Sequence, residues 1–544
     1  MTINNGFSID DLLNAISRFE GIPPSVVRVI ETHISRVFIS SKFVYKQKKN
    51  IAFSFVDYTT LKNRRKFSGE ELSLNRRSCS GVYLDILEVR KKKDKVFLGF
   101  KGGKIVDFLV RMRRIPDEVF LISIINININ LSDEFLRGRR HLKIYDINAI
   151  LKRIAKRVYL FHKNARTSKK ISKHGGIDVY KENWDDNFKA VMNFFDSFKE
   201  GLYRERVLDI HDFYVSFLES QKFLDFADMR IKSGFIRDCH GDLRMEHIAV
   251  LDRGCINDIC IMDCVEFNEK LRMQDIYLDI AFLLMDFEYH GFFYESVEFF
   301  GYYKSFFNSA AGDKFKDYEF AVMFFFKSYR AFVRSKVAVL SNKTGDALMY
   351  LRLCLFYSII LRKPLTILNM GLAGSGKTEL SAMLGRYFDA EVLSSDKIRK
   401  EKFYEKELYA PSVTKKVYDD IFKEWQRLVL SGKNVILDAT FLKEEFRALF
   451  IESYKKINCN FIIIYSKIED EKEYIILERI RKRKRNHFEK KDYSDADEAV
   501  YLNQKKNFVP PAVDNGPVIA VDASLELKDR FNYVLNKFLS LYFI

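Results

Sequence analysis

The segment LTILNMGLAGSGKTE (Leu365–Glu379) sets the architecture expected for the C-terminal part of the chain. Its first six residues, Leu365–Met370, form an apolar run of the length of a buried parallel strand. The phosphate-binding pattern G-x-x-x-x-G-K-[ST] follows, in which glycines let backbone N–H groups turn toward an anion. The candidate phosphate-binding residues are Gly371, Gly374, Ser375, Gly376, Lys377 and Thr378.

A helix is expected directly after this loop, because Leu380, Met383 and Leu384 recur at helical spacing. Its positive N-terminal end would face the bound phosphate. We expect Lys377 to contact the β- and γ-phosphates and the Thr378 hydroxyl to hold Mg²⁺. The alternative, a glycine-rich turn with a chance lysine, is disfavoured by this strand–helix context. The sequence therefore predicts ATP with Mg²⁺ as cofactor.

Length and composition predict a folded chain of several domains. At 544 residues the chain is too long for one ordinary core, and its 47% hydrophobic residues, with 8 Pro and 24 Gly, exclude a disordered chain. The net charge of +17 favours anionic partners, with nucleotides first and nucleic acid as an alternative.

The cysteines and the apolar runs predict a cytoplasmic protein. Seven scattered cysteines without a CxxC pair are expected to be reduced thiols. The first residues, MTINNGFSIDDLL, lack the order of charged and apolar regions that a signal peptide has. The longest apolar run near the middle, Leu353–Leu361, is far shorter than the ~20 residues of a membrane span, so no membrane partner is expected.

Hydrophobic patterns up to Lys232 predict strands followed by helices. The predicted strands and hairpins lie in Phe43–Tyr58, Tyr83–Phe100 and Lys104–Arg113. The predicted helices cover residues 9–19, 24–39, 60–80 and most of 147–232. Ile124–Asn130 fits an edge strand or a loop, and the polar segment Lys163–Asn183 is predicted to be a mobile loop.

Two carboxylates about twenty residues apart form the first chemical constellation. Asp242 follows His240 and Gly241 in a loop between apolar segments, and Asp263 follows the predicted strand Asp258–Met262. Such a pair suits a phosphotransferase, because one carboxylate accepts the substrate hydroxyl proton and the other holds Mg²⁺. The alternative is a loop that His240 and Asp242 merely tie together by hydrogen bonds.

The sequences HGDLRMEH, MDCVEF and DIYLDIAFLLMD resemble the aminoglycoside phosphotransferase family, which has the protein-kinase fold. The resemblance is greatest to its subgroup fused to a P-loop domain, the bifunctional aminoglycoside phosphotransferase/ATP-binding proteins. It covers roughly residues 30 to 340, with an insertion around Ile122–Asp146. It implies that Asp242 is the catalytic base, Asp263 binds metal and Asp279 braces the catalytic loop.

His247 departs from this family pattern, since it stands where most members have a metal-binding Asn. A neutral histidine is a poor Mg²⁺ ligand, although it can accept a hydrogen bond or ligate through one nitrogen. The departure puts the phosphotransfer activity of the first domain in question.

The resemblance also implies a small N-terminal lobe with a phosphate-pairing lysine and a helix glutamate. Lys46 and Lys48 lie on one side of a strand, and Lys46 is preferred. Glu71 is preferred over Glu70 as the partner. The alternative for each is an exposed charge run. The segment Val110–Pro116 lies where this fold has its hinge.

The second constellation follows the phosphate-binding loop, after a domain boundary at Arg362–Pro364. Asp396 and Asp438 each lie at the carboxyl end of an expected strand, where open α/β sheets bind ligands. Asp396 is the candidate base and Arg399 a candidate substrate ligand, while Asp438 would support Mg²⁺ through water or Thr378. Ala439 stands where ATP-driven motors have a glutamate, which favours phosphoryl transfer.

A basic segment predicts a lid that closes over the phosphates. Its arginines are Arg479, Arg481, Arg483 and Arg485, and the last two are the candidate catalytic pair. The alternative is a solvated basic helix. Residues 365 to 544 resemble the small P-loop kinases related to polynucleotide kinase, zeta toxin and chloramphenicol phosphotransferase, in which an Asp at the Asp396 position is the usual base.

We therefore expect a kinase-like α+β domain at 1–345 and an α/β P-loop kinase domain with a parallel sheet at 364–544. The expected function is ATP-dependent transfer of phosphate to a hydroxyl of a small molecule. One alternative is a 5′-hydroxyl nucleic-acid kinase. The other is a nucleotide-sensing regulatory protein whose first domain is a pseudokinase.

Overall fold

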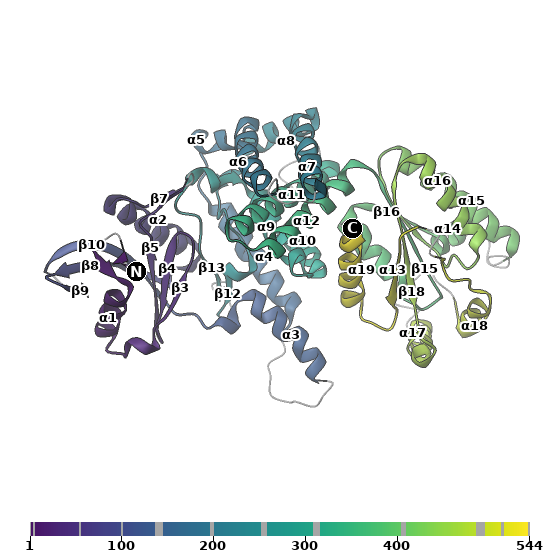
Figure 1. Ribbon diagram of the computed structural model, residues 1–544. Coiled ribbons are helices and arrows are strands. Elements are labelled where there is room, and N and C mark those ends of the chain that lie inside the picture. Colours follow the sequence, from purple (N-terminus) through teal and green to yellow (C-terminus); the bar gives the residue numbers. More distant parts are fainter. Residues whose placement is uncertain are drawn as a thin grey trace.

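The computed structural model describes most of the chain in three successive regions, a small lobe, a helical lobe and a parallel-sheet domain (Figure 1). The described residues are 2–3, 6–53, 56–99, 102–135, 145–195, 201–251, 258–307, 316–403, 410–485, 496–512 and 516–541.

A six-stranded antiparallel sheet of order β3-β4-β5-β10-β8-β9 forms the small lobe. Its strands are β3 (Arg28–Glu31), β4 (Ser35–Ile39), β5 (Phe43–Lys48), β8 (Tyr83–Lys92), β9 (Lys95–Leu98) and β10 (Lys104–Arg113). Helix α1 (Ile9–Glu20) packs on β9, and α2 (Leu61–Cys79) packs on β8 and β10. Two short pairs, β1–β2 (Thr2–Ile3, Phe7–Ser8) and β6–β7 (Ala52–Phe53, Val56–Asp57), complete the strands of this lobe.

Three local predictions in this half of the chain are wrong. The predicted helix at 24–39 is a 3₁₀ turn followed by β3 and β4, because its β-branched residues pair with neighbouring strands. Ile124–Asn130 lies within helix α3 (Leu121–Phe135), which buries Leu121, Ile124 and Ile125 on one face. The predicted loop at 163–183 holds α5 (Lys169–Ser172) and the start of α6 (Ile177–Phe195). Part of the expected insertion, residues 136–144, lies outside the described residues.

The helical lobe surrounds two short antiparallel strand pairs that flank the candidate catalytic loop. The paired strands are β11 (Ile236–Asp238) with β14 (Met273–Asp275), and β12 (Ile248–Val250) with β13 (Ile259–Ile261). The further helices are α4 (Ile147–Asn164), α7 (Gly201–Glu219), α8 (Gln221–Lys232), α9 (Ile276–Tyr289), α10 (Phe293–Phe306), α11 (Lys316–Leu340) and α12 (Thr344–Arg362). Helix α9 is buried almost all round, which fits its nearly continuous apolar sequence.

A five-stranded parallel sheet of order β16-β17-β15-β18-β19 forms the C-terminal domain, and the expected fold class is confirmed. The strands are β15 (Leu365–Gly371), β16 (Ala390–Ser394), β17 (Asn434–Asp438), β18 (Asn460–Lys467) and β19 (Val518–Asp522). The helices are α13 (Lys377–Phe388), α14 (Ser395–Lys402), α15 (Pro411–Leu430), α16 (Glu444–Ile457), α17 (Glu473–Arg485), α18 (Glu498–Asn507) and α19 (Leu527–Leu541).

One hydrophobic core runs from the helical lobe into the parallel-sheet domain. Helices α13 and α19 lie at the junction between α10 and α12 on one side and the parallel sheet on the other (Figure 1). The ring of Phe538 on α19 packs 5.5 Å from that of Phe356 on α12, and Tyr387 on α13 packs 5.4 Å from Phe324 on α11. The two domains are therefore joined by apolar packing.

Two features bear on the compartment expected from the sequence. Helix α12 is long and apolar enough to cross a membrane, yet 56% of its most apolar window is buried inside the protein. Cys79 and Cys260 are joined in a disulfide, so the expectation of reduced thiols is wrong for this pair. Their spacing of 181 residues gives no local signal, because the contact between α2 and β13 forms only in the fold.

Candidate functional site

Lys46, Glu71 and Asp263 meet between the small lobe and the helical lobe. Lys46 Nζ lies 2.9 Å from Glu71 Oε1 and 2.6 Å from Asp263 Oδ1. Burial alone would lower the pKa of Lys46, but the two carboxylates hold it well above its usual range. Lys48 lies deeper, 2.8 Å from Glu71 Oε2, and also pairs with Glu266. The structure thus brings Lys46, the preferred lysine, to Asp263.

Asp263 has an uncommon backbone conformation. Its φ of 63° lies in the left-handed region, which a non-glycine residue adopts at a cost in energy. Such strain is concentrated at functional sites, where the surrounding structure holds it in place. Here the backbone N–H of Asp263 donates to the Tyr83 hydroxyl at 3.2 Å, and this contact helps to aim the carboxylate at Lys46.

Asp242 lies beside Arg244 and His247 in the loop between β11 and β12. Arg244 donates to both carboxylate oxygens of Asp242, at 2.9 and 3.0 Å. Burial would raise the pKa of Asp242, but Arg244 and then His247 hold it below its usual range. His247 Nδ1 lies 2.8 Å from the Asp242 backbone oxygen, and its Nε2 lies 3.7 Å from Asp263 Oδ2. His247 therefore stands between the two carboxylates.

Asp279 and Asp286 of α9 accept hydrogen bonds from the backbone of this loop. The N–H groups of His240 and Gly241 donate to Asp279 at 2.6 and 2.9 Å, and Gln274 donates at 2.7 Å. The N–H of Met245 donates to Asp286 at 2.8 Å. The backbone of the loop is thus held by two carboxylates on the same face of α9, two helical turns apart.

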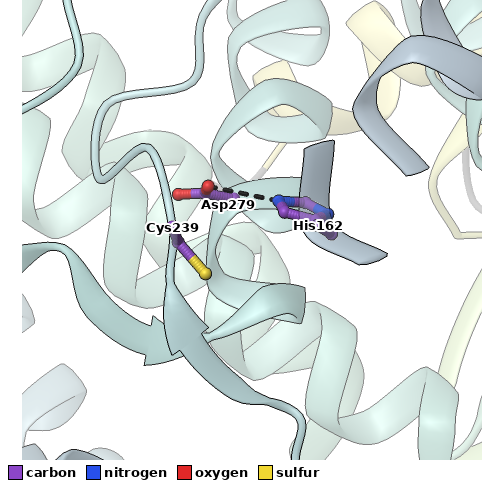
Figure 2. A group of neighbouring side chains, drawn as sticks. All are labelled: His162, Cys239 and Asp279. Atoms are coloured by element: carbon purple, nitrogen blue, oxygen red, sulfur yellow. Dashed lines mark hydrogen bonds and ion pairs between the residues drawn. The ribbon is translucent and has the colours of Figure 1, made fainter. Parts of the chain in front are cut away.

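Asp279, His162 and Cys239 also lie close enough together to suggest a metal site (Figure 2). The figure shows His162 paired with Asp279, at 3.2 Å, and Cys239 beside them. All three are buried, and His162 Nδ1 is 2.8 Å from the Tyr303 hydroxyl. Because Asp279 already accepts hydrogen bonds on both oxygens, the cluster is better described as the anchor of the loop that carries Asp242 than as a metal centre.

The phosphate-binding loop has the conformation that its glycines predict. Gly374 and Gly376 have φ values of 75° and 74°, in the left-handed region that glycine tolerates. Lys377 Nζ donates to the backbone oxygen of Leu372 at 2.9 Å. The N–H of Ala373 donates to the side-chain oxygen of Gln504 on α18 at 2.8 Å.

Two carboxylates lie at the strand ends next to this loop. Residue Ser394 of β16 pairs with Asp438 of β17 in the sheet, and Asp396 follows in the first turn of α14. Thr378 Oγ1 donates to Asp438 Oδ2 at 2.9 Å. Burial lowers the pKa of Lys377, and the nearby Asp438 and Asp396 oppose this effect. Both aspartates therefore lie within electrostatic reach of the phosphate-binding lysine.

The oxygen atoms of Thr378 and Asp438 fit Mg²⁺. Asp438 Oδ1 is buried and has no hydrogen-bond partner among the described residues. Burial also raises the pKa of Asp438. A hard divalent cation prefers carboxylate and hydroxyl oxygens, and it would satisfy this oxygen.

The candidate arginines differ in their surroundings. Arg399 is buried, with its guanidinium 3.5 Å from Thr414 Oγ1. Arg479 donates to the backbone oxygens of Ala523, Ser524 and Leu525, and Arg481 pairs with Glu498. Arg483 donates to the Ala496 oxygen at 2.7 Å and is close enough to lower the pKa of Lys377. The side chain of Arg485 lies outside the described residues.

Three residues at these sites were not predicted from the sequence. They are Arg244, Gln504 and Arg530, the last of which lies against the phosphate-binding loop. Arg530 carried a usable signal, because it is a charged residue on the apolar face of an amphipathic helix. No pattern pointed to Gln504, whose contact depends on where α18 packs.

Fold and sites together define a protein with a kinase-like domain followed by a P-loop domain. Residues 367–511 match the family described as AAA domain. An uncharacterized protein of Mycobacterium tuberculosis is 26% identical over 439 residues, which cover 78% of this chain and 80% of the relative. The same figures hold for an uncharacterized protein of Mycobacterium bovis.

Two solved structures are also similar to this chain. One is an aminoglycoside 2'-phosphotransferase-IIIa in complex with GDP, 11% identical with a TM-score of 0.34, covering 64% of this chain and 97% of that one. The other is a gluconokinase from Sinorhizobium meliloti, 18% identical with a TM-score of 0.25, covering 33% of this chain and 93% of that one. The P-loop region expected from the sequence agrees with the family match over residues 367–511.

Proposed function

We propose that this protein is an ATP-dependent phosphotransferase that transfers the γ-phosphate to a hydroxyl of a small molecule. The observation that carries the proposal is the meeting of Asp396 and Asp438 with Lys377 and Thr378 at the carboxyl edge of the parallel sheet. A phosphate-binding loop with a metal-supporting carboxylate and a second carboxylate nearby has the parts of a kinase site.

Each residue of the P-loop site has a distinct task in this proposal. Lys377 exchanges its contact with the Leu372 oxygen for the phosphates when nucleotide binds. Asp396 accepts the proton of the attacking hydroxyl, and Arg399 orients the acceptor. Thr378 and Asp438 would hold Mg²⁺, which when bound neutralises charge on the phosphates. Arg483 and Arg485 approach from the lid as charge develops.

The kinase-like site has the parts of a second nucleotide site. Lys46, fixed by Glu71, would contact phosphate, and Asp263 with His247 would hold a metal. Asp242 would act as base, but its bidentate pairing with Arg244 must loosen before it can accept a proton. This pairing, together with His247, favours a second candidate function for the first domain, namely nucleotide binding without efficient transfer.

A phosphoryl-transfer screen in the full chain tests the proposal. ATP consumption is measured with sugars, aminoglycosides, nucleosides and 5′-hydroxyl oligonucleotides as acceptors. We expect Lys377→Ala to abolish nucleotide binding at the P-loop site and the turnover that depends on it, because the lysine is the cation of the loop. Lys423→Ala, an exposed lysine on α15, is the matched control and leaves both unchanged. Nucleotide affinity and turnover in the Lys377→Ala protein equal to those of the unmodified chain would refute the P-loop assignment.

A further inference from the structure

Arg530 of α19 lies directly behind the phosphate-binding loop. Its side chain is almost completely buried, and one guanidinium nitrogen, Nη1, donates to the backbone oxygens of Ser375 and Gly376, each at 3.0 Å. The residue lies beyond the segment 367–511 that matches the AAA domain family. Arg530 thus lies outside the matched segment, yet it contacts the loop itself.

Because the peptide bond is planar, these two hydrogen bonds also orient the N–H groups of the same peptide units. In a trans peptide unit the C=O and the following N–H point to opposite sides. Holding the oxygens of Ser375 and Gly376 toward Arg530 turns the N–H groups of Gly376 and Lys377 away from it. These N–H groups belong to the turn that opens α13, where an anion binds to backbone donors.

The fit between the loop and Arg530 is tight. A Cβ atom on Gly376 would lie 2.4 Å from Arg530 Nη1, so a larger residue there would displace the guanidinium. The carboxylate paired with it is that of Glu379, whose Oε2 lies 3.6 Å from Arg530 Nη2, and the Glu379 side chain is 71% exposed. A buried cation is costly unless it is compensated, and here the backbone oxygens of the loop supply the main hydrogen bonds.

The opposite side of α19 is docked on the kinase-like domain. Lys528 Nζ lies 2.6 Å from Glu295 Oε1, and the Tyr294 N–H donates to Asn532 Oδ1 at 2.8 Å. Asn536 donates to the Gly291 oxygen at 3.3 Å. The helix that carries Arg530 is thus fixed between the two domains, with the loop on one side and α10 on the other.

We propose that Arg530 is a positioning residue of the P-loop, which aligns the N–H groups of Gly376 and Lys377 for the nucleotide phosphates. The inference rests on the proposed nucleotide site, because it concerns the geometry of that site. Arg530 acts through the loop backbone and does not contact the nucleotide.

Binding of Mg²⁺-AMP-PNP and of AMP to the full chain, measured by calorimetry, tests this inference. The binding event that Lys377→Ala removes identifies the P-loop site. We expect Arg530→Gln to weaken AMP-PNP binding at that site about 10- to 100-fold and AMP binding much less, since lost backbone donors affect the β- and γ-phosphates most. Arg530→Lys, which keeps the charge on a single donor nitrogen, should give an intermediate affinity.

The controls separate positioning from folding. Lys537→Gln, an exposed position on the same helix, should leave binding unchanged. Equal weakening of AMP-PNP and AMP, or unchanged affinity in both Arg530 variants, would overturn the inference while the proposed nucleotide site stands. If Arg530→Gln fails to fold, the same comparison of AMP-PNP and AMP binding is made with the Arg530→Lys protein. The absence of any event removed by Lys377→Ala would instead refute the proposed function.

Discussion

Asp396 is the residue whose chemistry is easiest to isolate. It lies in the first turn of α14, close enough to Lys377 to affect its pKa, yet no described hydrogen bond ties it to the loop. In the proposed function its carboxylate serves the acceptor, while Lys377, Thr378 and the loop backbone would hold the nucleotide. Binding and proton transfer are thus assigned to different residues, and mutations can separate them.

We predict that Asp396→Asn leaves nucleotide affinity nearly intact and lowers kcat by about 10²–10⁴-fold, because the amide cannot accept the hydroxyl proton. Steady-state kinetics with the acceptor found in the screen, together with calorimetric titration of AMP-PNP, check this. Asp419→Asn, an exposed carboxylate on α15, is the matched control. A parallel loss of affinity and rate would assign Asp396 to metal binding or to the fold.

Individual residues were predictable where a motif fixed their spacing. The loop glycines, Lys377 and Thr378 follow from one pattern, and their local geometry agrees with it. The sequence did not distinguish which of Lys46 and Lys48 pairs with the phosphates, because both face one side of β5. Their positions relative to Asp263 differ only in the fold. Arg244 sits two residues from Asp242, but its bidentate contact depends on loop conformation.

Among the helices, the buried carboxylate of Glu288 joins its own helix to four others. It lies on α9, pairs with Lys327 of α11 at 3.0 Å, and accepts from the hydroxyls of Tyr357 on α12 and Tyr387 on α13 at 2.6 and 2.9 Å. Ser296 of α10 also donates to it, at 2.7 Å. Because α13 begins at the phosphate-binding loop and α9 braces the catalytic loop, this buried pair lies where the supports of both sites meet.

We predict that Glu288→Leu lowers the free energy of unfolding by about 3–5 kcal/mol, because it leaves the buried Lys327 ammonium without its carboxylate. Adding Lys327→Met should recover much of this loss. Urea denaturation of the single and double variants measures both effects. Glu298→Gln is the control, since its pair with half-exposed Arg386 is worth less than about 1 kcal/mol. A double variant that loses the full sum would contradict the pairing argument.

Elements were predictable where one pattern dominated, as in α2, the β8–β9 hairpin and β15. The error at residues 24–39 arose because the segment carries apolar spacing compatible with a helix, while its valines and isoleucines pair in the sheet. The error at Ile124–Asn130 was the opposite one. The alternation of isoleucine with asparagine is compatible with a strand, but the buried residues of this segment follow helical spacing. In both cases tertiary contacts outweighed local preference.

At the scale of the whole molecule, the shared core makes the two domains depend on each other. Apolar residues of α12, α13 and α19 belong to one cluster with those of α9, α10 and α11. The docking of α19 on α10 adds polar contacts at the same junction. The boundary expected near Arg362–Pro364 therefore crosses one shared core, although a second core cluster lies wholly within the parallel-sheet domain.

We predict that the full chain unfolds in one calorimetric transition and that Mg²⁺-AMP-PNP shifts the whole transition upward. At a ligand concentration one hundred times the Kd, the gain in stability is about 2.7 kcal/mol. Scanning calorimetry with and without ligand, and with the Lys377→Ala protein as control, measures the shift. Two separate transitions, of which the ligand moves one, would show that the domains unfold independently.

The docking of α19 also has a consequence for the synthesis of the protein on the ribosome. The helical lobe is finished when α12 ends at Arg362, but α19, which covers part of its apolar surface, begins at Leu527. At about 5–20 residues per second, that surface stays uncovered for on the order of 10 s in every nascent chain. During this interval the apolar surface that α19 later covers is exposed, and transiently exposed apolar surface makes a folding chain prone to aggregation.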